Sequence, residues 1–94
     1  MPQSFQVVIS PAFERDARRV TRRNPETADL LEELIAVLEE DPYNRAAQHD
    51  IRKLTGVKPG KGQWRIRQGD YRLRYDIFRR DVVLYSLRHR KEAY

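Results

Sequence analysis

The sequence predicts an α+β fold in which an N-terminal strand and a helical hairpin pack on one face of a small antiparallel β-sheet. Apolar residues recur every three or four positions between residues 11 and 41, which is typical of amphipathic helices. Between residues 64 and 78 they recur at every second position, which is typical of half-buried strands. Strands that follow a helical hairpin favour an antiparallel sheet covered on one side. A chain of 94 residues has material for one core, so we treat residues 1–94 as a single domain.

The sequence begins with a predicted strand and a predicted helix. Phe5, Val7 and Ile9 alternate with other residues, so we expect a short strand there. Ser10 and Pro11 begin a helix, because serine is a favoured N-cap and proline is tolerated at the first helical position. An apolar stripe follows at helical spacing, formed by Phe13, Ala17 and Val20.

A second cap-and-proline pair, Asn24-Pro25, predicts that another helix begins there. Asp41-Pro42 ends it, because the residue before a proline is disfavoured in helical conformation. The apolar stripe of this helix is Leu30, Leu31, Leu34, Ile35 and Leu38. Because hardly any residues separate the two helices, we expect an antiparallel helical hairpin.

The second half of the sequence predicts strands. Residues 51–54 are a candidate start of a strand, and residues 55–62, rich in Gly, Pro and Lys, predict a turn region. Two alternating segments follow, separated by compact turns at residues 68–70 and 79–81. Residues 82–87 are apolar on both faces, which is typical of an interior strand. The expected order is β-α-α-β-β-β.

The two halves of the sequence differ in charge. Residues 1–50 carry 6 basic and 10 acidic side chains, whereas residues 51–94 carry 13 basic and 4 acidic ones. Nine of those 13 are arginines, whose planar guanidinium suits bidentate phosphate recognition. This asymmetry favours a polyanion as the ligand, with an idle solvated basic face as the alternative.

Composition excludes several classes of protein. The sequence holds no cysteine, so we expect neither a disulfide framework nor a thiolate metal site. Its first residues lack the basic start and apolar stretch of a signal peptide. No apolar run approaches the roughly 20 residues of a membrane-spanning helix. We therefore expect a cytoplasmic protein without a membrane partner.

Alternation gathers arginines on one face of the predicted sheet. If Trp64, Ile66, Tyr71, Leu73 and Tyr75 point toward the helices, the side chains between them point away. Those side chains belong to Arg65, Arg67, Arg72 and Arg74. Like charges on neighbouring strands repel each other and contribute nothing to folding, so the cluster predicts a surface that binds an anion.

The C-terminal residues add three candidates. Arg90 is a further phosphate ligand, His89 can exchange a proton near neutral pH, and Tyr94 can stack on a base or hydrogen-bond a ribose. The plainer interpretations are a solvated histidine and a tyrosine without a function. We expect no metal site, because His49 and His89 lie far apart in sequence and neither has acidic partners at ligand spacing.

Together these segments resemble the RelE/ParE toxin superfamily, and most closely its RelE branch. The resemblance rests on five stretches: Lys53-Leu54-Thr55-Gly56, Trp64-Arg65-Ile66-Arg67, Tyr71-Arg72-Leu73-Arg74-Tyr75, residues 82–87 and His89-Arg90-Lys91-Glu92-Ala93-Tyr94. It extends over nearly the whole chain, since the first strand and the helical hairpin also match. The individual stretches are loose, and their order and spacing carry the specificity.

The resemblance implies the toxin of a type II toxin–antitoxin system. RelE-like members are endoribonucleases (mRNA interferases) that cleave mRNA, typically in the ribosomal A site, without a metal or another cofactor. The catalytic residues that the resemblance implies are Arg65, Arg67, Arg72, Arg90 and Tyr94. Arg65 and Arg67 stand where the family has lysines, which puts more of the proton transfer on His89. Further RNA contacts are expected from Lys53, Lys61, Arg74 and Lys91.

The expected reaction is attack of a ribose 2′-hydroxyl on the adjacent phosphate, which leaves a 2′,3′-cyclic phosphate and a 5′-hydroxyl. The implied partners are a cognate antitoxin, mRNA and the ribosome, with operator DNA reached only through the antitoxin. Two alternatives stay open. One is a ParE-type inhibitor of DNA gyrase with the same fold, against which the ending from His89 to Tyr94 argues. The other is a basic nucleic-acid-binding module without catalysis.

Overall fold

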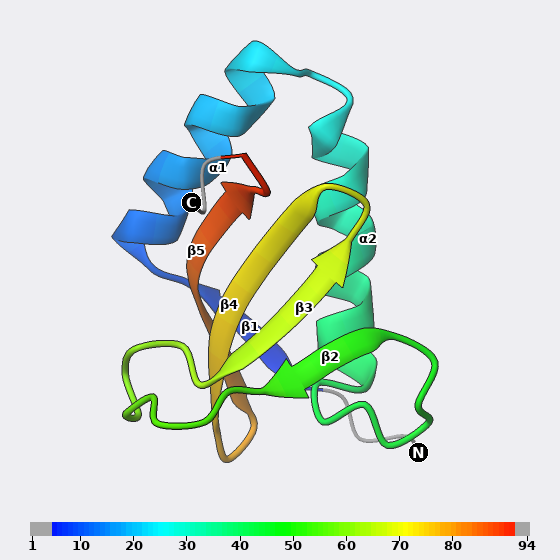
Figure 1. Ribbon diagram of the computed structural model, residues 1–94, viewed down its shortest axis with the longest axis vertical. Helices are drawn as coiled ribbons and strands as arrows, with labels where there is room; N and C mark the ends of the chain where they lie inside the picture. The colour runs from blue at the N-terminus through cyan, green and yellow to red at the C-terminus, as the bar shows by residue number, and fades with distance from the viewer. Residues whose placement is uncertain (1–4, 92–94) are drawn as a thin grey trace.

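The computed structural model of the protein describes residues 5–91, in which two helices pack on a five-stranded sheet (Figure 1). The chain begins with strand β1 (Gln6–Ile9), followed by helices α1 (Pro11–Arg23) and α2 (Thr27–Glu40). The remaining strands are β2 (Asp50–Lys53), β3 (Trp64–Gln68), β4 (Tyr71–Phe78) and β5 (Asp81–His89). The predicted α+β class is confirmed, and the segment at residues 50–53 is a separate strand, which makes the order β-α-α-β-β-β-β.

The sheet is mixed, although the sequence led us to expect an antiparallel one. The strand order is β1-β5-β4-β3-β2, and β2 to β5 form the expected antiparallel meander. Strand β1 instead pairs in parallel with β5, with Val7 opposite Val82. Parallel pairing requires a long crossover, which the segment between these two strands supplies. Strand β5 lies between β1 and β4, so its predicted interior position is confirmed.

The core lies between the helices and one face of the sheet. The helices contribute buried side chains at helical spacing, namely Phe13, Val20, Leu31, Leu34 and Leu38. The facing side chains of the sheet are Ile51, Ile66, Leu73, Tyr75, Val82, Leu84 and Leu87. The inward orientation predicted for β3 and β4 is therefore confirmed. The arginines between these residues point to the opposite, open face.

The helix ends follow the capping rules in part. The Ser10 side chain accepts a hydrogen bond from the N–H of Phe13 at 3.1 Å, so the predicted N-cap of α1 is confirmed. Helix α2 begins at Thr27 with Glu26 as its N-cap, and not at Pro25 with Asn24 as its N-cap, because the Asn24 carbonyl accepts the N–H of Thr27 in a turn that precedes the helix. Asp41 is the C-cap of α2, as predicted. In the described part of the chain, neither helix has the length and apolar character needed to cross a membrane.

Candidate nucleic-acid interface

The open face of the sheet carries the arginines that alternation predicted. In the register of β3 and β4, Arg65 lies opposite Arg74 and Arg67 lies opposite Arg72. Strand β5 adds Arg88, which lies opposite Arg72 on its other side. The Cβ atoms of directly opposed residues are only about 5 Å apart, so three neighbouring strands concentrate positive charge on this face.

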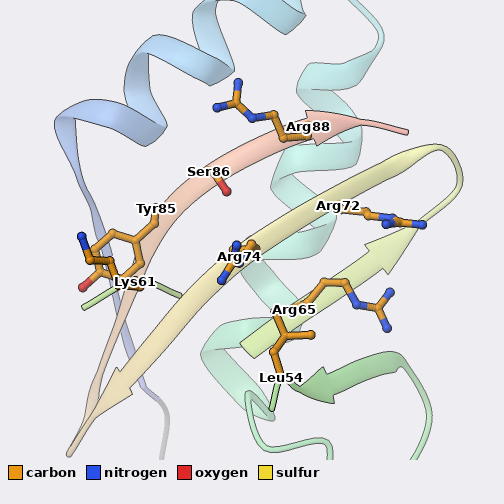
Figure 2. A pocket seen from close by; sticks show the side chains of 8 residues that line it. All are labelled: Leu54, Lys61, Arg65, Arg72, Arg74, Tyr85, Ser86 and Arg88. Carbon is orange, nitrogen blue, oxygen red and sulfur yellow. The ribbon is translucent and has the colours of Figure 1, made fainter. Parts of the chain in front are cut away.

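A cleft of about 630 Å³ opens on this face, with eight residues lining it (Figure 2). Five of them are cations: Lys61, Arg65, Arg72, Arg74 and Arg88. The other three are Leu54, Tyr85 and Ser86, so none of the described residues that line the cleft is acidic. The side chains come from β3, β4, β5 and the β2–β3 connection (Figure 2). We call this hollow the cationic cleft.

Two carboxylates beside the cleft offset part of its charge. Asp50 on β2 accepts hydrogen bonds from Arg65 at 3.3 Å and from Arg67 at 2.7 Å. Burial raises the pKa of Asp50, but the hydrogen bond from Arg67 and the charges of three nearby arginines outweigh it and hold the pKa below its ordinary 3.8. Asp16 on α1 lies 3.4 Å from Arg88. The cleft keeps an excess of positive charge over these two carboxylates.

Asp76 fastens the β2–β3 connection beside the cleft. This residue is 1% exposed. Its carboxylate accepts hydrogen bonds from the backbone N–H groups of Gly60 at 2.6 Å, Gly62 at 3.1 Å and Gln63 at 2.6 Å. Arg74 holds the same connection, because it donates two hydrogen bonds to the Gly62 carbonyl oxygen, at 3.1 and 2.9 Å. The three backbone N–H groups are therefore already paired with the Asp76 carboxylate. Arg74 both lines the cleft and holds the β2–β3 connection in place.

A β-bulge in β5 brings two consecutive side chains into the cleft. Arg74 of β4 pairs with Ser86 and the next residue of β4 pairs with Leu84, so Tyr85 is the extra residue. Tyr85 and Ser86 both line the cleft, whereas regular alternation places consecutive side chains on opposite faces. Beyond the bulge the alternation is inverted, and Leu87 is buried in the core.

The phenol of Tyr85 lies near the carboxylate of Asp76. Burial and the nearby carboxylate of Asp76 raise the pKa of Tyr85. The phenol therefore stays protonated at neutral pH. It is a neutral polar group among the cations of the cleft.

The predicted catalytic arginines occupy two adjoining hollows. Arg65 and Arg72 line the cationic cleft. Arg67 and Arg90 line a smaller hollow that also includes Arg72, Gly69 and Asp70. Asp70 contacts Arg90 twice, because its carbonyl oxygen accepts the Arg90 N–H at 2.7 Å and its carboxylate lies 3.7 Å from the guanidinium. The structure thus brings these four arginines into one continuous basic surface.

His89 does not lie at the cationic cleft. It is opposite Tyr71 in the sheet, and the two rings pack edge-to-face with their centroids 5.1 Å apart. It lines a separate hollow, next to α1, with Val20, Arg23, Asn24, Tyr71 and Lys91. The physical reason is the bulge at Tyr85, because one extra residue exchanges the faces of all side chains that follow it. Arg88 consequently faces the cleft and His89 faces the helices.

The remaining predicted residues divide between the two faces. Lys61 and Arg74 line the cationic cleft. Lys91 lies in the hollow next to α1, and Lys53 has its ammonium 5.9 Å from the ring centroid of Trp64, whose ring stacks on the core residue Tyr75. Tyr94 lies outside the described residues.

Besides Asp50 and Asp76, sequence reasoning missed four residues that line or support the site. Arg88, Tyr85 and Ser86 reach the cleft through the bulge, for which the sequence carries no distinct signal. Asp16 is buried on α1, and its carboxylate accepts a hydrogen bond from the backbone N–H of Leu87 at 3.0 Å. This N–H has no partner on β1, because the pairing of β1 with β5 ends at Leu84. The position of Asp16 between Phe13 and Val20 on the apolar stripe is the one signal available. Within residues 5–91, no group of three or more His, Asp or Glu side chains is arranged to hold a metal ion.

The fold and the cationic cleft are consistent with a toxin of the RelE/ParE superfamily. The family model described as the ParE toxin of the type II toxin–antitoxin system parDE matches residues 7–94, so the chain belongs to this family. A comparison with curated proteins gave no significant match.

Solved structures of toxins share the fold. The RelB-RelE antitoxin-toxin complex from Methanococcus jannaschii contains a chain that is 20% identical, with 93% of this chain and 94% of that chain covered and a TM-score of 0.71. A copper-bound mutant toxin from Helicobacter pylori is 19% identical, with coverage of 96% and 99% and a TM-score of 0.71. YafQ from E. coli strain BL21(DE3) is 14% identical, with coverage of 96% and 98% and a TM-score of 0.70. At these identities the similarity establishes the fold, and the first of these structures is an antitoxin–toxin complex.

Proposed function

We propose that this toxin is an endoribonuclease that cleaves mRNA in the ribosomal A site, and hence acts in the cytoplasm. The observation that carries the proposal is the cationic cleft, where five cations converge and none of the described lining residues is acidic. The basic surface continues into the hollow of Arg67 and Arg90. Because the basic surface extends over two adjoining hollows, it fits the repeated phosphates of a nucleic-acid strand better than a single small anion. The resemblance to the RelE branch, whose members cleave mRNA, supports the same conclusion.

The proposed reaction is attack of a ribose 2′-oxygen on the adjacent phosphorus. A bond forms between O2′ and phosphorus, and the bond from phosphorus to the 5′-oxygen of the next nucleotide breaks. The 2′-hydroxyl loses its proton and the departing oxygen gains one, so the step needs no co-reactant. Negative charge grows on the phosphate oxygens in the transition state, and Arg65, Arg72 and Arg88 are the residues that we propose stabilise it. One well-placed donor of this kind contributes about 3–4 kcal/mol.

The other residues have separate proposed roles. Arginine stays protonated in proteins, so the arginines supply charge and do not act as the base. His89 faces the helices, so we propose no role for it in proton transfer. Tyr94 remains the proposed residue for base stacking and proton transfer, and Arg67 and Arg90 are proposed to hold the neighbouring phosphate. Lys61 completes the proposed RNA contacts at the far end of the cleft.

The proposed antagonist is an antitoxin encoded by the neighbouring gene. An excess of positive charge on an open face fits an acidic or amphipathic antitoxin segment that covers the cationic cleft. Covering the cleft blocks access of RNA and explains how the toxin is kept inactive. Contact with operator DNA is then made through the antitoxin.

The experiment that tests the proposal compares Arg72→Ala with Arg22→Ala, which removes the same charge from an exposed position near the end of α1. Each purified protein is incubated with mRNA and translating ribosomes, and the RNA ends are mapped. We expect the wild type and Arg22→Ala to cut within codons, and Arg72→Ala to cut at least about 100-fold more slowly with its circular dichroism unchanged. A folded Arg72→Ala protein with full activity contradicts the site, and an inactive wild type contradicts the function.

Inhibition of DNA gyrase is the second candidate function, because the matching family model is that of ParE toxins. A supercoiling assay with purified gyrase separates the two candidates. Inhibited supercoiling with intact mRNA favours the ParE-type activity, and cut mRNA with normal supercoiling favours the nuclease. If neither activity is found, a basic binding module is the remaining interpretation.

A further inference from the structure

The cationic cleft has many hydrogen-bond donors and few acceptors. Lysine and arginine side chains only donate, and leucine does neither. Among the eight side chains that line the cleft, acceptors are therefore confined to the hydroxyl groups of Tyr85 and Ser86. Any ligand group that must donate a hydrogen bond to a side chain in this cleft has to use one of these two residues.

Phosphate contacts alone do not distinguish RNA from DNA. Both strands carry the same phosphates, and the five cations of the cleft bind those groups in either. The chemical difference is the ribose 2′-hydroxyl, which donates as well as accepts. Phosphate oxygens compete with it for the donors of the cleft, so recognition of the 2′-hydroxyl requires an acceptor.

Tyr85 presents an acceptor to the cleft beside a carboxylate that favours one orientation of its O–H group. A carboxylate only accepts hydrogen bonds, so the nearby Asp76 favours an orientation of Tyr85 in which the O–H points toward that carboxylate and the lone pairs of its oxygen are available to a ligand. The carboxylate is itself held by the three backbone N–H groups of the β2–β3 connection. The raised pKa of Tyr85 keeps the proton in place at neutral pH.

We propose that Tyr85 accepts a hydrogen bond from the ribose 2′-hydroxyl of a strand bound in the cationic cleft, and that this bond makes the cleft prefer RNA to DNA of the same sequence. The proposal deepens the proposed function and rests on one part of it, the binding of a nucleic-acid strand in the cleft. Figure 2 shows Tyr85 near Lys61 at one end of the cleft, with Arg65 and Arg72 toward the other. In the proposed binding mode Tyr85 contacts a ribose at one end of the cleft, and Arg65 and Arg72 contact phosphate toward the other.

The test measures binding, which does not require cleavage. The full chain is titrated by fluorescence anisotropy with an RNA strand, with DNA of the same sequence that contains deoxyuridine, and with RNAs that carry one 2′-deoxy nucleotide at each position in turn. Titrations are read at low temperature, and a denaturing gel confirms that the RNA is intact. Tyr85→Phe removes the acceptor. Tyr71→Phe is the matched control, because Tyr71 lies on the helix-facing side of the sheet.

One hydrogen bond of this kind corresponds to an affinity difference of about 3- to 10-fold. We expect the wild type and Tyr71→Phe to bind RNA about 3- to 10-fold more tightly than DNA, with most of the difference arising at one 2′-deoxy position. Tyr85→Phe is expected to bind RNA as weakly as the wild type binds DNA, with its affinity for DNA unchanged. Its affinity for RNA should also be the same with and without the 2′-deoxy nucleotide at the sensitive position. If removing the 2′-hydroxyl no longer lowers RNA affinity once the Tyr85 hydroxyl is absent, the two groups are energetically coupled, as expected for a direct contact.

Several outcomes overturn the inference. A folded Tyr85→Phe protein that still prefers RNA overturns it, and so does loss of the preference in Ser86→Ala alone, which moves the contact to Ser86. If Tyr85→Phe does not fold, the 2′-deoxy scan on the wild type decides, and a scan without any sensitive position overturns the inference. If the wild type does not cleave RNA but loses its RNA preference in Tyr85→Phe, the nuclease proposal fails and this inference stands.

Discussion

Asp76→Asn tests whether one buried carboxylate holds the β2–β3 connection beside the cleft. One carboxylate oxygen of Asp76 accepts the N–H groups of Gly60 and Gly62, and the other accepts the N–H of Gln63. Asparagine has a single acceptor oxygen, so its NH2 group faces at least one of these donors in either orientation. The substitution keeps the size of the side chain and changes only its charge and hydrogen bonding.

The magnitude follows from the three bonds. In the better orientation the amide oxygen keeps the two glycine N–H groups, and the N–H of Gln63 loses its acceptor. A buried donor without an acceptor costs about 1–3 kcal/mol, and loss of the charge weakens each remaining bond by about 1 kcal/mol. We therefore expect Asp76→Asn to lower the free energy of unfolding by about 3–5 kcal/mol. For a domain of this size that lowers Tm by at least about 12 °C.

The assay is thermal and urea unfolding followed by circular dichroism. Asp81→Asn is the matched control, because it makes the same charge change at an exposed position at the start of β5. We expect Asp81→Asn to stay within about 0.5 kcal/mol of the wild type. If Asp76→Asn also stays within about 0.5 kcal/mol, the carboxylate does not hold the connection and the reasoning is wrong.

Two further predictions concern the same face. Gly62→Ala should destabilise the protein more than Gly56→Ala: both glycines have a positive φ, +82° and +77°, but only at Gly62 would an added Cβ lie 3.0 Å from the Cβ of Arg74. Urea unfolding measures the difference, and equal losses contradict it. Asp50 has a pKa lowered by its arginine neighbours despite burial, so its contribution to stability is present above the ordinary pKa of 3.8 and is lost as the pH falls through the folded-state value. Stability should therefore fall more steeply below about pH 4 in the wild type than in Asp50→Asn, and parallel curves in a pH series of unfolding measurements would refute this.

Much of the fold could be predicted from local physical chemistry. The Ser10 cap, the apolar stripes of both helices and the outward arginines of β3 and β4 follow from capping and periodicity, and the structure confirms them. The parallel pairing of β1 with β5 was not predicted, because periodicity identifies a strand without giving its neighbour or direction. The separate strand at Asp50–Lys53 is too short for its alternation to be distinctive.

The positions of the candidate site residues were predicted in part, and the bulge in β5 accounts for the unexpected places of Arg88 and His89. Alternation held for Arg65 and Arg72, which line the cleft, because β3 and β4 are regular. No alternation was predicted for β5, where the extra residue Tyr85 exchanges the two faces and places Arg88 at the cleft and His89 on the helix-facing side. A bulge is fixed by tertiary packing and leaves no reliable pattern in a single sequence, so Tyr85 was found only in the structure.

The most direct test of the central claim is the chemical identity of the RNA ends that the purified protein produces. If the cationic cleft promotes attack by the 2′-hydroxyl, mRNA on translating ribosomes should acquire 2′,3′-cyclic phosphate and 5′-hydroxyl ends. These ends should be absent with folded Arg72→Ala and present with Arg22→Ala. Intact mRNA in the presence of the wild-type protein, or ends that carry a 5′-phosphate, would contradict the account.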